Sequence, residues 1–88
     1  MEDLLLTRVY LDEYENLLTA KIGLPLTEIQ YYEEYKGSAL ASFERPIVTV
    51  HLYSGEAVCI AIGFEMFKSH IDKFRREQDS FGVRMKNN

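Results

Sequence analysis

Two runs of β-branched and other apolar residues flank a Ser-Gly pair in the middle of the chain, and this feature constrains the fold most. The runs are Ile47–Tyr53 and Glu56–Ile62, separated by Ser54-Gly55. A two-residue loop that ends in Gly between two such runs is typical of a β-hairpin. Pro46 precedes the first run, where a missing backbone N–H disturbs the ladder least. The sequence therefore predicts an antiparallel hairpin over residues 47–62.

The position of this loop also predicts which side chains share each face of the hairpin. With Ser54-Gly55 as the loop, Tyr53 lies opposite Glu56 and Val50 lies opposite Cys59. One face is then uniformly apolar and carries Val48, Val50, Leu52, Ala57, Cys59 and Ala61. The other face mixes apolar and polar groups and carries Ile47, Thr49, His51, Tyr53, Glu56, Val58, Ile60 and Ile62. A slip of one residue would exchange the two faces.

A capping-box pattern near the N-terminus predicts the first helix. In Asp12-Glu13-Tyr14-Glu15 the first carboxylate can accept a backbone N–H while the last one reaches back. Leu18 and Ile22 continue an apolar stripe at a spacing of four residues. The sequence predicts a strand over residues 4–11 and a helix over residues 12–22, with one continuous helix from residue 3 as the alternative.

Two more helices are predicted further along the chain. Thr27-Glu28-Ile29-Gln30 is a second capping box, which predicts a short helix over residues 28–36. Residues 64–79 carry an apolar stripe with helical spacing, which predicts a C-terminal helix. The stripe consists of Phe64, Phe67, Ile71 and Phe74. The predicted fold class is α+β, with three helices packed on a small antiparallel sheet centred on the 47–62 hairpin.

Length and composition favour one folded domain. The chain has 88 residues, of which 47% are hydrophobic, and a formal net charge of −4. These values predict one domain over residues 1–85 and a polar tail over residues 86–88. The longest apolar run, Ala57–Phe64, is far shorter than the roughly 20 residues of a membrane-spanning helix. A lone cysteine and an acidic start predict a cytoplasmic protein with no membrane association.

Nucleophiles and metal ligands are few. Cys59 is the only thiol, and His51 and His70 are the only imidazoles. In the predicted hairpin Cys59 and His51 lie on opposite faces, which does not favour a Cys–His pair. The spacing of ligand-type residues matches no zinc, calcium or phosphate-loop motif. We therefore predict a protein that is not an enzyme, with no catalytic, cofactor or metal site.

Charge is distributed unevenly along the chain. Residues 1–44 hold three basic and nine acidic residues, a net of −6, whereas residues 45–88 hold seven basic and five acidic residues, a net of +2. The acidic half favours a basic protein partner or simple solubility. The basic residues of the last third support nucleic-acid binding as an alternative. They are Lys68, Lys73, Arg75, Arg76, Arg84 and Lys86.

The segment around residues 31–35 combines tyrosines with carboxylates, and it is the predicted surface for a protein partner. Tyrosine offers contact area and a polar tip at low entropy cost, which suits recognition surfaces, although packing of two of the tyrosines in the core is the alternative. The predicted partner-binding residues are Tyr31, Glu33, Glu34 and Tyr35, with Asp12 and Glu13 as steering charges.

The mixed face of the predicted hairpin must be covered by something. Its large apolar groups are too many to leave in water, since burying each is worth roughly 1.5–3 kcal/mol. The 12–22 helix or a second copy of the chain would cover it. The residues predicted for self-association into a homodimer are Ile47, His51, Tyr53, Val58, Ile60 and Ile62.

The string from Val9 to Leu18 resembles the strand-then-capped-helix openings of many small proteins, phage-encoded ones among them. This resemblance assigns no family, but it favours a small accessory protein. The predicted function is a non-catalytic protein-binding module, an inhibitor or regulator that occludes its partner. The alternatives are a nucleic-acid-binding protein and a homo-oligomer that sequesters a ligand.

Overall fold

One antiparallel sheet and one long helix make up the structure, a computed structural model that describes residues 3–86, with side chains up to residue 77. Within that range the elements are β1 (Asp3–Leu11), β2 (Leu17–Pro25), the 3-10 turn η1 (Leu26–Glu28), β3 (Ile29–Glu34), β4 (Ile47–Leu52), β5 (Ala57–Ala61) and α1 (Phe64–Lys86). The sheet order is β2-β1-β5-β4-β3, and all neighbouring strands are antiparallel. The fold is therefore α+β, as predicted.

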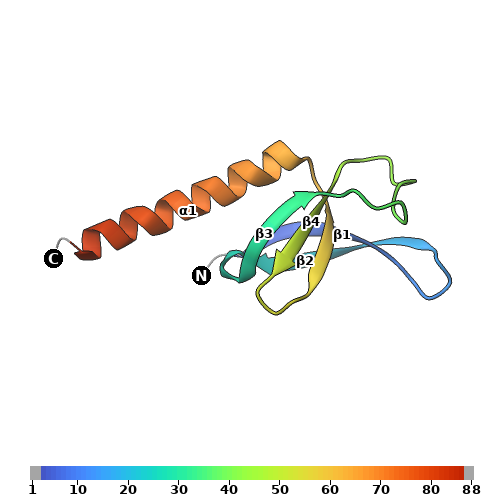
Figure 1. The fold of residues 1–88 in the computed structure, drawn as a ribbon, viewed down its shortest axis with the longest axis horizontal. Coiled ribbons are helices and arrows are strands. Elements are labelled where there is room, and N and C mark those ends of the chain that lie inside the picture. The colour runs from blue at the N-terminus through green and yellow to red at the C-terminus, as the bar shows by residue number, and fades with distance from the viewer. Residues whose placement is uncertain (1–2, 87–88) are drawn as a thin grey trace.

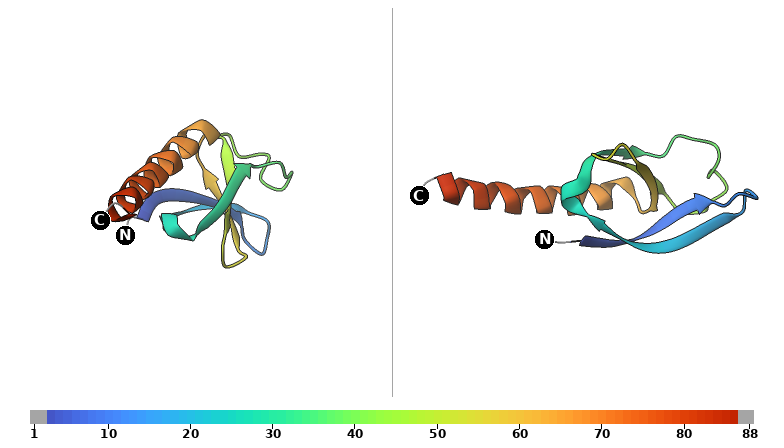
Figure 2. Two further views of the ribbon diagram at one scale, coloured as in Figure 1. Left: turned by 60° about the vertical axis from the view of Figure 1, so that its left-hand side comes forward. Right: turned by 90° about the horizontal axis from the view of Figure 1, so that it is seen from below.

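The core lies between the sheet and the first turns of α1. Phe67 and Ile71 of the helix are 0% and 1% exposed, and the ring of Phe67 meets the ring of Tyr32 edge-on at a centroid distance of 5.0 Å. The other buried members of this cluster are Leu6, Leu24, Leu26, Ile29, Val48, Val50 and Ile60. Beyond them α1 continues past the sheet, away from the tip of the β1–β2 hairpin (Figures 1 and 2). The C-terminal stripe was thus predicted correctly, and the helix extends to Lys86.

The predicted helix over residues 12–22 is wrong, because β2 occupies most of this segment. Leu18 and Ile22 are four residues apart, and this spacing fits one side of a strand as well as one side of a helix. In the structure Ile22 pairs with Leu6 of β1, on the core side of a nine-residue ladder. The carboxylate of Asp12 accepts the N–H groups of Tyr14 and Asn16, both at 2.8 Å. The same short side-chain bond serves helix caps and turns alike.

The predicted short helix over residues 28–36 is also wrong, and a β-bulge explains the error. Ile29 pairs with Leu52 and Tyr31 pairs with His51, so β3 uses two residues where β4 uses one. The bulge turns Ile29 and Tyr32 toward the core although they are three residues apart. In a bulged strand, core-facing residues can therefore be three residues apart, the same spacing as on one side of a helix.

The 47–62 hairpin is present, but its register differs by one residue from the predicted one. Val50 lies opposite Val58, and Thr49 lies opposite Cys59. The loop holds three residues rather than two, because Leu52 N–H donates to the carbonyl of Glu56 at 2.9 Å. The faces of β4 are therefore as predicted, whereas those of β5 are exchanged. As a result Ile60, which we expected on the outer face, is 0% exposed in the core.

The 35–46 connection folds back over the face of the β1–β2 hairpin that points away from α1. Its Leu40 is 6% exposed, its Arg45 lines a small pocket with Thr7 and Lys21 of that hairpin, and Val9 of β1 is 1% exposed. This loop covers the part of that face around Val9, whereas Leu5, on the same side nearer the start of β1, is 81% exposed. Within residues 3–86 no helix has the length and apolar character needed to cross a membrane. Of the predicted polar tail, Lys86 belongs to α1, while Asn87 and Asn88 lie outside the described residues.

Candidate functional site

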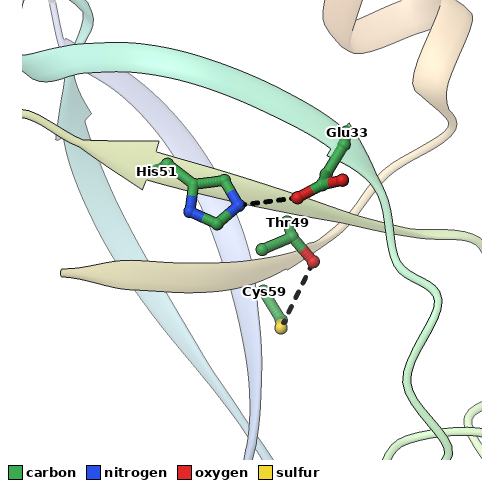
Figure 3. A network of polar contacts seen from close by, with 4 residues as sticks. All are labelled: Glu33, Thr49, His51 and Cys59. Atoms are coloured by element: carbon green, nitrogen blue, oxygen red, sulfur yellow. Dashed lines mark hydrogen bonds and ion pairs between the residues drawn. The ribbon is translucent and has the colours of Figure 1, made fainter. Parts of the chain in front are cut away.

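Strands β3, β4 and β5 place a group of polar and aromatic side chains on the sheet face opposite α1. Because side chains alternate along a strand, Tyr31 and Glu33 point away from the core that Tyr32 enters. Direct cross-strand pairing sets Tyr31 beside His51 and Glu33 beside Thr49. We call Tyr31, Glu33 and His51 the outer-face cluster (Figure 3 shows Glu33 and His51).

The outer-face cluster is held together by a ring stack and a hydrogen bond. The rings of Tyr31 and His51 lie 4.2 Å apart between centroids and 10° from parallel. Nε2 of His51 lies 2.8 Å from Oε2 of Glu33 and donates to it when that nitrogen carries the proton. Tyr31 is 49% exposed, so its ring is both oriented and accessible. An exposed pair of this kind contributes only about 0–1 kcal/mol to stability, and its main effect is to fix the two rings.

Cys59 lies on the same outer face but has a different neighbour. Its Sγ is 4.0 Å from Oγ1 of Thr49, the residue directly across from it. The prediction that Cys59 and His51 lie on opposite faces is wrong, because the one-residue register change moves Cys59. The imidazole is nevertheless directed to Glu33 and not to the thiol (Figure 3).

Two of the predicted partner-binding residues have structural roles. Asp12 closes the β1–β2 turn, and the N–H groups of Asn16 and Tyr14 and the side-chain amide of Asn16 hold the pKa of its carboxyl below the ordinary value. The hydroxyl of Tyr35 accepts the N–H of Leu40 at 3.1 Å and so anchors the 35–46 connection. A Cβ at Gly37 would lie 2.5 Å from this hydroxyl, which explains the glycine there.

The remaining predicted residues are spread over the molecule. Glu13 is exposed at the tip of the β1–β2 hairpin, far along the long axis from β3 (Figure 1). Glu34 points to the opposite side of β3 from Glu33 and lines a groove next to the start of α1.

The six residues predicted for self-association are divided between two environments. Ile60 is buried, and Val58 and Ile62 pack against the core. Ile47 and His51 are half-buried on the outer face, and Tyr53 is 66% exposed in the β4–β5 turn.

The sequence does not predict the contact of Tyr31 and Glu33 with His51, because it places His51 on the self-association surface and the other two on the partner surface. Strands β3 and β4 are separated in the sequence by the long 35–46 connection, so no local sequence pattern predicts that they pair. Exposed Met66 at the start of α1 was also missed, since it lies beside the apolar stripe.

Within the described residues no group of three or more histidine, cysteine or carboxylate side chains is arranged to hold a metal ion. Comparisons with protein-family models, with curated proteins and with solved structures find no match for this chain.

Proposed function

We propose that this chain is a non-catalytic protein-binding module that uses the outer-face cluster to contact its partner and acts as an inhibitor or regulator by occlusion. The observation that supports it is the Tyr31 ring, which is half exposed yet stacked on His51. An aromatic ring that is oriented before binding loses little entropy on association. Such anchors supply most of the affinity at protein interfaces.

Charge and strand order support the choice of partner. β3 is an edge strand, so a partner can approach it from the side as well as from the outer face. Glu33 adds a carboxylate at this edge, and Glu34 adds another on the opposite side of the strand. A basic protein surface fits this arrangement, and the carboxylates would mainly raise the association rate.

The test compares two exposed tyrosines on different elements. Tyr31→Ala removes the anchor, whereas Tyr14→Ala removes an equally large ring that is 77% exposed at the tip of the β1–β2 hairpin. The immobilised full chain is used to capture its partner from a cell lysate, and the captured protein is then titrated against each variant. We expect Tyr31→Ala to weaken binding by about 30-fold, the effect of losing an anchor worth about 2 kcal/mol, and Tyr14→Ala to leave it unchanged.

Two outcomes contradict the proposal. If wild-type chain captures no protein at micromolar concentration, there is no partner of useful affinity. If Tyr31→Ala and Tyr14→Ala bind equally well, the contact surface lies elsewhere.

We also propose homodimer formation through the outer face, but with fewer of the predicted residues in the contact. Of the predicted set, His51 belongs to the outer-face cluster, Ile47 is half-buried on the same face, and Tyr53 is exposed in the adjoining β4–β5 turn. A dimer formed there would compete with the partner. Light scattering at about 100 μM, with Tyr53→Ala as the variant, tests this, and a monomer at that concentration would exclude a stable dimer.

The nucleic-acid alternative has weaker support, because one of its basic residues is already engaged. Nζ of Lys68 donates to Asp72 at 2.8 Å, and this bond raises the pKa of Lys68 above its ordinary value. We propose a cytoplasmic setting, since Cys59 is a free thiol.

A further inference from the structure

An open groove of about 500 Å³ lies where the end of β3, the start of β4 and the first turn of α1 meet. Its apolar wall includes Pro46, Ile47, Phe64 and Met66, and its charged groups are Glu34 and Glu65. Met66 is 62% exposed, so much of its side chain is accessible from the groove. The volume falls in the range of about 300–1,000 Å³ that is typical of ligand pockets.

The groove is negatively charged, and neither Glu34 nor Glu65 forms an ion pair with a described side chain. Lys68, which lies near enough to Glu65 to feel its charge, is hydrogen-bonded to Asp72 instead. The positive end of α1 offsets only about half a unit of charge. Two carboxylates beside an apolar wall therefore present a site for a group that is apolar along its length and cationic at its end.

From this geometry we infer that the groove binds an arginine side chain from a basic segment of the partner protein. The aliphatic stem of arginine would lie on Phe64 and Met66, as long cationic side chains commonly lie on apolar surface. The planar guanidinium can donate to both carboxylates and stack on an aromatic ring, which an ammonium group does less well. The inference rests on the proposed function, because Glu33 and Glu34 point to opposite sides of the same edge strand. A partner that binds along the edge of β3 would contact the outer-face cluster on one side of the strand and insert this arginine into the groove on the other.

The test uses a defined peptide rather than the partner. The probe is acetyl-Gly-Leu-Arg-Leu-Gly-amide, and its control carries citrulline, a neutral group of nearly the same shape, in place of arginine. Both are titrated into the ¹⁵N-labelled full chain, and amide chemical shifts are followed. We expect shifts at Glu34, Ile47, Glu65 and Met66, with a Kd on the order of 1 mM, and binding of the citrulline peptide weaker by about tenfold.

Variants of the chain then test whether Glu34 and Glu65 are the carboxylates that bind the arginine. Glu34→Gln with Glu65→Gln should weaken the arginine peptide by about tenfold and leave the citrulline peptide unchanged, since both changes remove the same interaction. Glu56→Gln, at an exposed position in the β4–β5 turn, is the matched control and should bind the arginine peptide like wild type. Gly63→Leu is a second variant that acts by shape, because a Cβ at Gly63 meets open space beside the groove. It should block both peptides, and its melting curve checks that the chain is folded.

The inference is overturned if the two peptides bind equally, if the shifts spread to a distant carboxylate such as Glu13, or if the double glutamine variant binds like wild type. Its failure can be told apart from failure of the proposed function. Partner capture that depends on Tyr31 but not on Glu34 and Glu65 would retain the outer-face cluster and discard the groove. If partner capture does not depend on Tyr31 but the arginine peptide still binds, the groove is retained and the outer-face cluster is discarded.

Discussion

The β1–β2 and β4–β5 hairpins close with the same three-residue turn but reach it with different residues. In the first, Asp12 N–H donates to Asn16 O at 3.1 Å and Glu15 N–H donates to Asp12 O at 3.0 Å. In the second, Leu52 and Gly55 make the equivalent bonds at 2.9 and 3.0 Å. The third loop residue has a positive φ in both, 64° at Glu15 and 95° at Gly55.

Glycine adopts this left-handed conformation without a steric cost, whereas an ordinary residue is destabilised there by about 1–2 kcal/mol. The β4–β5 turn therefore adopts this conformation through Gly55, with one weaker side-chain bond, from the N–H of Glu56 to the hydroxyl of Ser54 at 3.3 Å. The β1–β2 turn holds Glu15 in the same conformation, and the carboxylate of Asp12 accepts three hydrogen bonds that offset the cost. The β4–β5 turn thus depends mainly on the backbone freedom of Gly55, and the β1–β2 turn depends on the side chain of Asp12. Substitutions at these two residues should therefore affect the two turns differently.

The largest difference between the hairpins is expected from their packing. Ile60 of β5 is 0% exposed, while Leu18 of β2 is 39% exposed on the projecting part of its hairpin. Ile60→Ala should reduce the free energy of unfolding by about 2–5 kcal/mol, because it removes buried methyl groups and leaves a cavity. Leu18→Ala should cost well under about 1.5 kcal/mol, since much of its side chain already contacts water. Urea denaturation measures both, and equal losses would mean that the β1–β2 hairpin is packed as tightly as the β4–β5 hairpin.

The next largest effect concerns the glycine turn. Gly55→Ala should destabilise the protein by about 1 kcal/mol through the positive φ alone, because a Cβ there meets nothing within 4 Å. Gly63→Ala is the matched control, since its Cβ also meets open space but no positive φ is involved. Thermal unfolding of the two variants gives the comparison. A loss of stability as large at Gly63 as at Gly55 would remove the backbone explanation.

A smaller and more local effect is expected at Asp12. Asp12→Ala leaves the N–H groups of Tyr14 and Asn16 without their acceptor and should loosen the β1–β2 turn while the core stays intact. Amide hydrogen exchange should rise at these two residues and remain unchanged at Gly55. Faster exchange throughout the sheet would show instead that this hairpin contributes to global stability.

Glu15→Gly should act in the opposite direction. It relieves the left-handed conformation of Glu15, and after the added entropy of glycine in the unfolded chain the net gain is about 0.5 kcal/mol. In the Glu15→Gly background, Asp12→Ala should loosen the turn less, because the turn then resembles that of the β4–β5 hairpin. A double-mutant cycle measures this coupling, and strictly additive effects would argue against it.

These turns also show how far the fold could be predicted. The aromatic stripe of α1 is repeated over several turns, and no strand accommodates that spacing, so the helix was identified correctly. The Asp12 motif and the four-residue spacing of Leu18 and Ile22 fit a capped helix and a hairpin equally well. Only the pairing of β2 with β1, a contact between distant residues, selects the hairpin. Likewise Ser54-Gly55 fits both a two-residue and a three-residue loop. The three-residue loop is the one that places Ile60 in the core cluster and Val58 against it.

The candidate site was predictable to a similar degree. The exposure of Tyr31 and Glu33 followed from the crowding of tyrosines and carboxylates in one short segment. Their meeting with His51 did not, because it depends on the bulge in β3 and on the pairing of β3 with β4. The groove was not predictable at all, since Glu34, Ile47 and Met66 come from three elements that meet only in the folded chain.

The smallest expected effect is a difference between the two turns in acid. The pKa of Asp12 is lowered by hydrogen bonds from Asn16 and Tyr14, so the folded carboxyl titrates below the value of 3.8 that it has in the unfolded chain. Its contribution to stability is therefore complete above about pH 4, and it is lost as the pH falls through the lower pKa of the folded state. In the β4–β5 turn the N–H of Glu56 donates to the hydroxyl of Ser54, and this acceptor does not titrate in acid. Lowering the pH from 6 to 2 should shift the amide of Asn16 and leave that of Gly55 in place until the whole chain unfolds. Asp12→Asn should abolish the Asn16 transition, and a transition that persists in this variant would assign it to another carboxyl.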